Sequence, residues 1–175
     1  MREEIYNSSV KFKGKFDIYK FYKDLKRYIY EELGWMGIFG EDRFETYYYQ
    51  KVSPEGLVSI EFNWSGNMNF WKEEPKINWY LNITGIINNY SIQTQTGEIE
   101  VKIKGEHEIE DVKEPEVKSF SEKILSSLGI SKVLLKKSFE KVRIEGSNIK
   151  DKSAANLYKT CDGLKEWISK YFNLY

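Results

Sequence analysis

Hydrophobic and polar residues alternate along several stretches of the chain, as is typical of β-strands that bury one face. The stretches are residues 10–16, 57–65, 77–84 and 98–104. A start near Ile5 would lengthen the first strand, and residues 90–95 suggest a further short one. Gly85 predicts a bulge or bend after the third stretch. Short turns between consecutive strands predict an antiparallel meander.

Residues 43–65 form an aromatic hairpin around a turn at residues 53–56 that contains Pro and Gly. If the loop holds an even number of residues, the register follows. It pairs Tyr49 with Ile60, Tyr47 with Phe62 and Glu45 with Trp64. These pairs make one face aromatic and buried, whereas Tyr48 lies on the polar face opposite Glu61.

Apolar residues at helical spacing predict a helix over residues 18–33, with Asp17 as its N-cap and Gly34 just past its end. Residues 35–40 predict a loop folded over the core. Two further helices are expected at residues 119–128 and 130–142, although residues 141–144 also fit a strand. Asp151 is expected to cap a last helix. Its apolar stripe consists of Leu157, Cys161, Leu164, Trp167, Ile168 and Phe172.

This order of elements predicts an α+β fold in a single domain over residues 1–175, with a helical C-terminal part from about residue 116. An antiparallel sheet of about five or six strands follows an N-terminal strand–helix unit, and the C-terminal helices pack on one face. The order is loosely similar to the helix-grip fold of START-like and polyketide-cyclase-like proteins. That similarity implies an apolar ligand held between a curved sheet and the last helix, and the helices predicted at 119–142 depart from it.

The composition, with 41% hydrophobic, 16% aromatic and 31% charged residues, is that of a folded domain. The 27 basic residues balance 27 acidic ones, so net charge does not argue for nucleic acid or a membrane surface. No apolar run approaches the ~18–20 residues of a membrane span. Without an apolar segment after Met1 that would predict export, we expect a cytoplasmic location.

Residues that could carry chemistry are few. His107, the only histidine, lies among Glu106, Glu108 and Glu110. In a strand these carboxylates fall on the face opposite His107, so the favoured interpretation is an exposed, solvated strand end. There His107→Ala would change stability by less than ~0.5 kcal/mol. A Ser-His-Asp triad stays open, although the nucleophile-elbow, phosphate-loop and dinucleotide motifs are all missing.

The single cysteine rules out an internal disulfide framework and a cysteine zinc site. Cys161 falls on the apolar stripe of the last helix and is interpreted as a small buried hydrophobe. We therefore expect no catalytic residue, no metal and no cofactor.

The aromatic residues are interpreted first as core and second as the lining of a ligand cavity. The candidate ligand-binding residues are Trp35, Tyr47, Trp64 and Trp79. A basic stretch could contact an acidic partner or nucleic acid. It comprises Lys132, Lys136, Lys137, Lys141 and Arg143. Nucleic acid is the disfavoured partner, because no RNA-binding aromatic signature accompanies these residues.

Three short segments carry a further resemblance. They are residues 12–22, beginning Phe-Lys-Gly-Lys-Phe-Asp, residues 45–48, and residues 97–101. Together they resemble a group of small uncharacterised archaeal proteins over roughly the first 110 residues, and no activity comes with that resemblance.

The leading hypothesis is a non-enzymatic interaction module that binds an unknown protein partner or itself. The alternative is a carrier of a small apolar ligand in a sheet–helix cavity. A hydrolase or metal enzyme near His107 ranks lowest.

Overall fold

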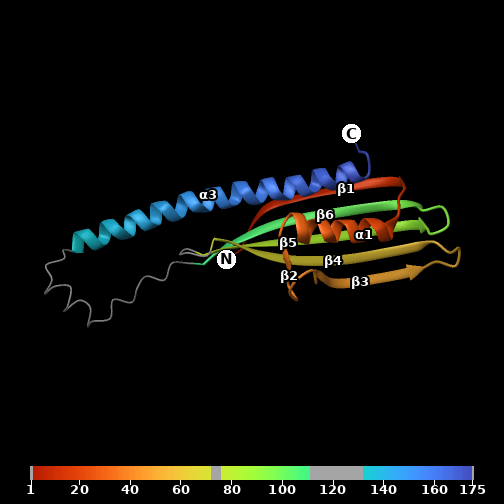
Figure 1. The fold of residues 1–175 in the computed structure, drawn as a ribbon, viewed down its shortest axis with the longest axis horizontal. Coiled ribbons are helices and arrows are strands. Elements are labelled where there is room, and N and C mark those ends of the chain that lie inside the picture. Colours follow the sequence, from red (N-terminus) through yellow and green to blue (C-terminus); the bar gives the residue numbers. More distant parts are fainter. Residues whose placement is uncertain (1, 72–75, 111–131, 175) are drawn as a thin grey trace.

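A computed structural model describes residues 2–71, 76–110 and 132–174 of this protein, with Trp71 and residues 132–147 described by their backbone only. The chain folds into a six-stranded antiparallel sheet with helices against it, which confirms the predicted α+β class (Figure 1). The strands are β1 (Arg2–Lys15), β2 (Met36–Gly37), β3 (Glu45–Val52), β4 (Val58–Trp71), β5 (Ile77–Ser91) and β6 (Thr96–Ile109).

The strands lie in the order β1-β6-β5-β4, and both β2 and β3 pair with the far side of β4. The N-terminal strand thus joins the sheet beside the last one. Strands β4 to β6 form the expected meander, because each connection is short enough for an antiparallel neighbour. The predicted loop at residues 35–40 contains β2, which pairs with Gly66 and Asn67 of β4.

Among the described residues, three helical segments pack on one face of this sheet, which we call the inner face. They are α1 (Ile18–Arg27), the π-helix η1 (Tyr28–Glu32) and α3 (Lys132–Tyr171). In Figure 1, α3 runs along β1, and α1 overlaps the middle strands with its axis roughly along them. Phe21 of α1 packs against Tyr171, the last residue of α3, with ring centroids 5.1 Å apart, so both helices close over one core.

The alternating residues predicted to be buried do lie on this inner face. Fully or almost fully buried are Ile60, Phe62 and Trp64 of β4, Ile77, Trp79, Leu81 and Ile83 of β5, and Ile99, Val101 and Ile103 of β6. The polar positions between them form the outer face, on which none of the described helices packs. The period-two pattern therefore assigned both faces of the central strands correctly.

Gly85 does not make the predicted bulge. It lies in the regular part of β5, opposite Phe62 of β4, and a Cβ atom there would fall 2.2 Å from the Phe62 ring. The irregularity comes later, between Asn88 and Ser91, where Asn89 adopts a φ of 52°. Strand β5 is continuous up to Ser91, so the separate strand predicted at residues 90–95 is wrong.

The predicted register of the β3–β4 hairpin is also wrong. Val52 pairs with Val58, so the loop consists of residues 53–57, an odd number. All pairs between the turn and the bulge at Thr46 are therefore shifted by one residue from the predicted register. Tyr48, not Tyr47, lies opposite Phe62, and Tyr47 and Tyr49 face outward beside Asn63 and Glu61. A one-residue shift exchanges the two faces of a strand.

The N-terminal helix begins and ends as predicted. The Asp17 side chain accepts a hydrogen bond from the Lys20 amide at 3.0 Å, and Gly34 has the positive φ of 71° that suits the residue after a helix. At the other end of the chain, α3 is one helix of 40 residues. Asp151 is therefore an interior residue of α3 and not a cap, and residues 141–144 are helical. The helix predicted at 119–128 lies outside the described residues.

Candidate functional site

Strand β3 is an open edge of the sheet in the part of the chain that the structure describes (Figure 1). It pairs with β4 on one side, and no described strand pairs with it on the other. All eight of its residues are exposed. Tyr47, Tyr48 and Tyr49 keep 45%, 42% and 49% of their surface accessible, so this edge offers aromatic side chains together with a strand backbone.

The hydrogen-bond pattern of the hairpin identifies which backbone groups of β3 are unpaired. The Ser53 amide donates to the Leu57 carbonyl at 2.8 Å, next to the pair of Val52 and Val58. In an antiparallel ladder, hydrogen-bonded pairs alternate with pairs that are not bonded. The N–H and C=O groups of Tyr48, Gln50 and Val52 therefore point away from β4, toward the open side.

A groove runs beside this edge on the inner face, between α1 and strands β3 and β4; we call it the α1–β3 groove. It has two hollows that share Tyr22 and Glu45. The smaller, of about 240 Å³, is lined by Ile18, Tyr19, Tyr22, Glu45, Tyr48, Ile60 and Phe62. The larger, of about 620 Å³, is lined by Tyr22, Lys26, Phe39, Arg43, Phe44, Glu45 and Trp64. Strand β3 contributes Glu45 to both hollows and Tyr48 to the smaller one.

Tyr22 is fixed in place between the two hollows. Its ring lies edge-on to Trp64, with centroids 4.6 Å apart. Its hydroxyl donates to the Glu45 carboxylate and accepts a hydrogen bond from the Trp64 indole at 3.1 Å. Burial, and then the Glu45 carboxylate, raise the pKa of Tyr22, so the phenol stays neutral at physiological pH. The aromatic side chain shared by the two hollows is therefore held in place before any ligand binds.

Charged groups gather at the wide end of the groove. Lys26 forms an ion pair with Asp42 at 3.0 Å, and the Arg43 Nε donates to the Gly40 carbonyl at 3.4 Å. Together with the carboxylate that Tyr22 already binds, they give this end mixed charge. An apolar or aromatic group suits the narrow end better than a charged one.

His107 belongs to a second candidate cluster, and its predicted exposure is wrong. Its side chain is only 1% exposed, because α3 covers the end of β6. Its Nδ1 lies 3.2 Å from the hydroxyl of Ser153, a fully buried residue of α3, and its Nε2 lies 3.4 Å from a Glu3 carboxylate oxygen. The Trp79 indole donates to the same Ser153 hydroxyl at 2.8 Å. We call these four side chains the His107 network.

A β-bulge at Ile5 brings Glu3 to the inner face. Glu3 pairs directly with His107, and the register shifts before Tyr6. Lys150 of α3 lies 2.8 Å from the Glu3 carboxylate. A hydrogen bond from Lys150, followed by one from His107, lowers the pKa of Glu3. The network thus joins the first strand, two central strands and α3 through polar groups only.

A carboxylate, a histidine and a serine in this order also make up a catalytic triad. Here the hydrogen bonds and the burial of the serine differ from those of a triad. The Ser153 oxygen accepts the Trp79 N–H, which leaves the serine proton for His107 Nδ1 and the Nε2 proton for Glu3. The hydroxyl has no exposed surface through which a substrate could reach it. In this structure the network satisfies buried polar groups and fastens α3 to the sheet.

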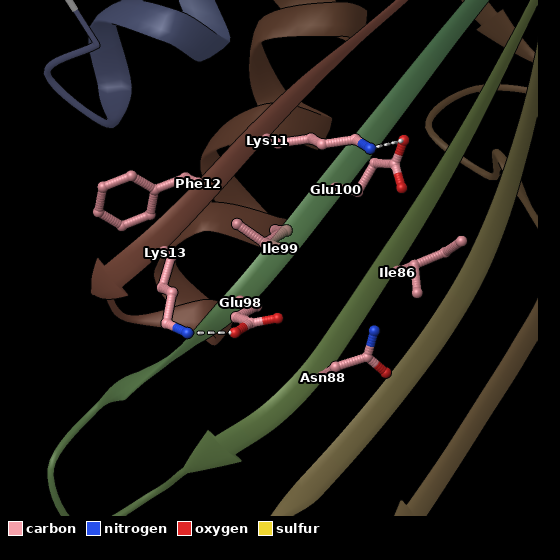
Figure 2. Close-up of a pocket in the computed structure, with 8 residues that line it drawn as sticks. All are labelled: Lys11, Phe12, Lys13, Ile86, Asn88, Glu98, Ile99 and Glu100. Atoms are coloured by element: carbon pink, nitrogen blue, oxygen red, sulfur yellow. Dashed lines mark ion pairs between the residues drawn. The ribbon is translucent and has the colours of Figure 1, made fainter.

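The outer face carries a third hollow, of about 430 Å³, over β1, β6 and β5 (Figure 2). Two ion pairs cross from β1 to β6, Lys11 with Glu100 at 3.6 Å and Lys13 with Glu98 at 2.6 Å. In each case the two residues are direct cross-strand partners. Because the charges compensate each other pair by pair, this surface presents no field of one sign for nucleic acid.

The structure does not bring the four candidate ligand-binding residues together. Trp35 and Trp79 are buried and pack on each other, with centroids 6.2 Å apart. Trp64 lines the wide hollow of the α1–β3 groove. Tyr47, predicted on the core side, lies on the outer face. The sequence pattern missed Tyr19, Tyr22 and Tyr48, which line the groove; the helical spacing of Tyr22 on the face toward the sheet was the signal that could have identified it.

The structure also places the cysteine and bears on metal ligands and membrane spans. Cys161 is buried, and burial raises the pKa of its thiol to about 12, which fits the predicted role as a small hydrophobe. Among the described residues, no three His, Cys, Asp or Glu side chains gather as metal ligands. No helix in that part of the chain is long and apolar enough to cross a membrane.

The basic stretch lies in the first half of α3, where the side chains fall outside the described residues. It comprises Lys132, Lys136, Lys137, Lys141 and Arg143.

No protein-family model, curated protein or solved structure shows a significant match to this chain. The site therefore has to be interpreted from its own residues. The resemblance to small archaeal proteins stays a prediction.

Proposed function

We propose that this protein is an interaction module that binds an extended polypeptide segment by adding it as a strand to β3. The observation that carries the proposal is the open edge of β3, with eight exposed residues and outward-pointing backbone groups at Tyr48, Gln50 and Val52. Strand addition derives affinity from main-chain hydrogen bonds and specificity from pockets for alternate side chains. The α1–β3 groove supplies such pockets on one face of the added strand.

The opposite edge of the sheet supports this choice by contrast. Strand β1 has a bulge at Ile5, and its exposed Lys11 and Lys13 project from the outer face. Helix α3 packs against it. Bulges, lysines and covering helices are the devices by which proteins block unwanted pairing at a strand edge. Strand β3 has a bulge only at its first end, contains no Pro, and has a single lysine, Lys51, next to its last residue.

A second candidate function is supported by the groove itself. Two hollows with aromatic walls could hold a small apolar ligand, as the carrier hypothesis expects. The two functions differ in what they require of the backbone. A carrier needs the side chains of Tyr22 and Tyr48, whereas strand addition needs the N–H of Gln50. A cytoplasmic location remains a prediction from the sequence for either function.

Gln50→Pro separates the two candidates. Proline lacks the outward N–H and is tolerated at edge positions whose N–H does not bond within the sheet. Gln50→Ala removes the same side chain but keeps the donor, and is the matched control. Peptides selected from a random library on the wild-type protein should bind Gln50→Ala normally and Gln50→Pro at least about tenfold more weakly.

Selected peptides that bind both variants equally would refute strand addition. A carrier would instead bind an apolar fluorescent probe in a one-to-one complex that Gln50→Pro leaves unchanged. Circular dichroism and thermal melting of both variants establish that the sheet is intact before binding is compared.

A further inference from the structure

We infer that the segment added to β3 is the β3 strand of a second copy of this chain, which gives a two-fold dimer with one sheet continuous across both molecules. The inference rests on the proposed strand addition and names its partner. It is argued from the complementarity of β3 with itself in an antiparallel arrangement, since two identical edges related by a two-fold axis must pair antiparallel.

One register uses all the outward-pointing backbone groups. If Gln50 lies opposite Gln50 of the second copy, Tyr48 lies opposite Val52, and each of these residues meets a residue whose backbone groups also point outward. Each contributes one donor and one acceptor, so about six hydrogen bonds form across the axis. A register centred on Tyr48 would instead place Gln50 opposite Thr46, where the bulge disrupts the strand.

The side chains in this register are complementary on both faces. On the outer face, Tyr49 lies opposite Lys51 of the second copy, and a lysine beside a tyrosine ring can make a cation–π contact. Within β3, no like charges lie directly opposite each other. On the inner face, Val52 of the second copy lies beside Tyr48. Val52 is 58% exposed in the single chain, so pairing covers an apolar side chain that is otherwise in water.

The second copy also completes the groove. The smaller hollow is lined by Tyr19 and Tyr22 of α1 and by Tyr48 of β3, the strand that no described strand pairs with on its other side. In the register centred on Gln50, Val52 of the second copy lies beside Tyr48 and so next to this hollow. Two grooves related by the axis would then lie side by side, each with one wall contributed by the other molecule.

Sedimentation velocity over a range of protein concentrations tests the dimer directly. The wild type and Gln50→Ala should both shift from monomer to dimer as concentration rises, and Gln50→Pro should dissociate at least about tenfold more readily. A wild type that stays monomeric throughout, or a dimer that Gln50→Pro does not weaken, would overturn the inference.

A cross-link tests the register and does not depend on the proline variant folding. Gln50→Cys places two thiols at the axis, where opposite Cα atoms of a hydrogen-bonded pair lie ~5.5 Å apart, within the range of a disulfide. Lys51→Cys is the control, because Lys51 lies opposite Tyr49 and not opposite itself. Mild oxidation should link the first variant and not the second; equal linkage of both would refute the register. The native Cys161 is buried and does not interfere.

Different results would refute self-pairing and strand addition. If the wild type is monomeric but selected peptides still lose affinity for Gln50→Pro, self-pairing is wrong and strand addition stands. If Gln50→Pro changes neither peptide binding nor association, both are wrong.

Discussion

Replacing Ser153 with alanine tests whether the His107 network fastens α3 to the sheet. The Ser153 hydroxyl accepts the Trp79 N–H at 2.8 Å and lies 3.2 Å from His107 Nδ1. All three side chains are almost completely buried, so water cannot replace the hydroxyl in the folded state. Ser153→Ala therefore leaves two buried polar groups without a partner, although it removes only one oxygen atom.

The loss in free energy of unfolding expected for Ser153→Ala follows from these contacts. A buried polar group that loses its partner costs about 1–3 kcal/mol. Alanine is a better helix former than serine and returns about 0.5 kcal/mol. For the two groups together we expect the free energy of unfolding to fall by about 1.5–5.5 kcal/mol, a large share of the ~5–15 kcal/mol typical of a domain. Asn156→Ala, at an exposed position of the same helix, should change it by less than ~0.5 kcal/mol.

Urea unfolding of the variants, followed by circular dichroism, provides the measurement. A double-mutant cycle with Trp79→Phe makes it specific. Phe has no N–H to satisfy, so Ser153→Ala should cost about 1–2 kcal/mol less in that background. A cost of Ser153→Ala below ~0.5 kcal/mol, or additive effects of the two changes, would show that the network does not act as a unit.

Three further substitutions test the packing and the electrostatics. Gly85→Ala should destabilise the fold strongly in thermal melts, because its Cβ would lie 2.2 Å from the Phe62 ring. Gly163→Ala, in α3 with no atom within 4 Å of the new Cβ, should instead stabilise by up to about 1 kcal/mol; loss of stability there would contradict the structure. The pKa of Glu3 is lowered in the folded state. Its contribution to folding stability is therefore complete above the ordinary glutamate pKa of about 4.3, and it is lost as pH falls through the folded pKa. Glu3→Gln should therefore reduce stability at pH 7 and flatten its decline in acid, and parallel acid titrations of wild type and variant would refute this.

The central strands could be predicted from the sequence because their pattern repeats with a simple period. Trp64 and Trp79 fall on the same buried face as their alternate neighbours, and each strand extends far enough for the pattern to be unambiguous. The Asp17 cap and the Gly34 end of the first helix were equally local signals. In all these cases, a few neighbouring residues determine the conformation.

The candidate sites were harder to predict from the sequence, because each depends on one irregular residue. The hairpin loop holds one residue more than an even loop, which turns Tyr48 inward and Tyr47 outward. The bulge at Ile5 brings Glu3 to the inner face, where it meets His107. His107 itself is buried by a helix that begins much later in the chain, and no nearby residue signals that contact. Single-residue irregularities and long-range docking have no periodic signature.

The two edges of the sheet explain why one fold holds both a buried polar network and an open strand. At the β1 edge, the bulge turns Glu3 inward, where it joins His107 and Ser153, and α3 packs against that strand. Polar groups that lose water there must bond to one another, and these bonds hold α3 against the strand. At the β3 edge no described helix covers the strand, and the backbone groups of Gln50 and its alternate neighbours remain available. The inward polar groups at the β1 edge are bonded to one another and a helix packs against that strand, which contributes stability. The β3 edge has no described helix over it and can exchange bound water for a partner strand. That difference is why we assign binding to β3 and the fastening of α3 to the His107 network.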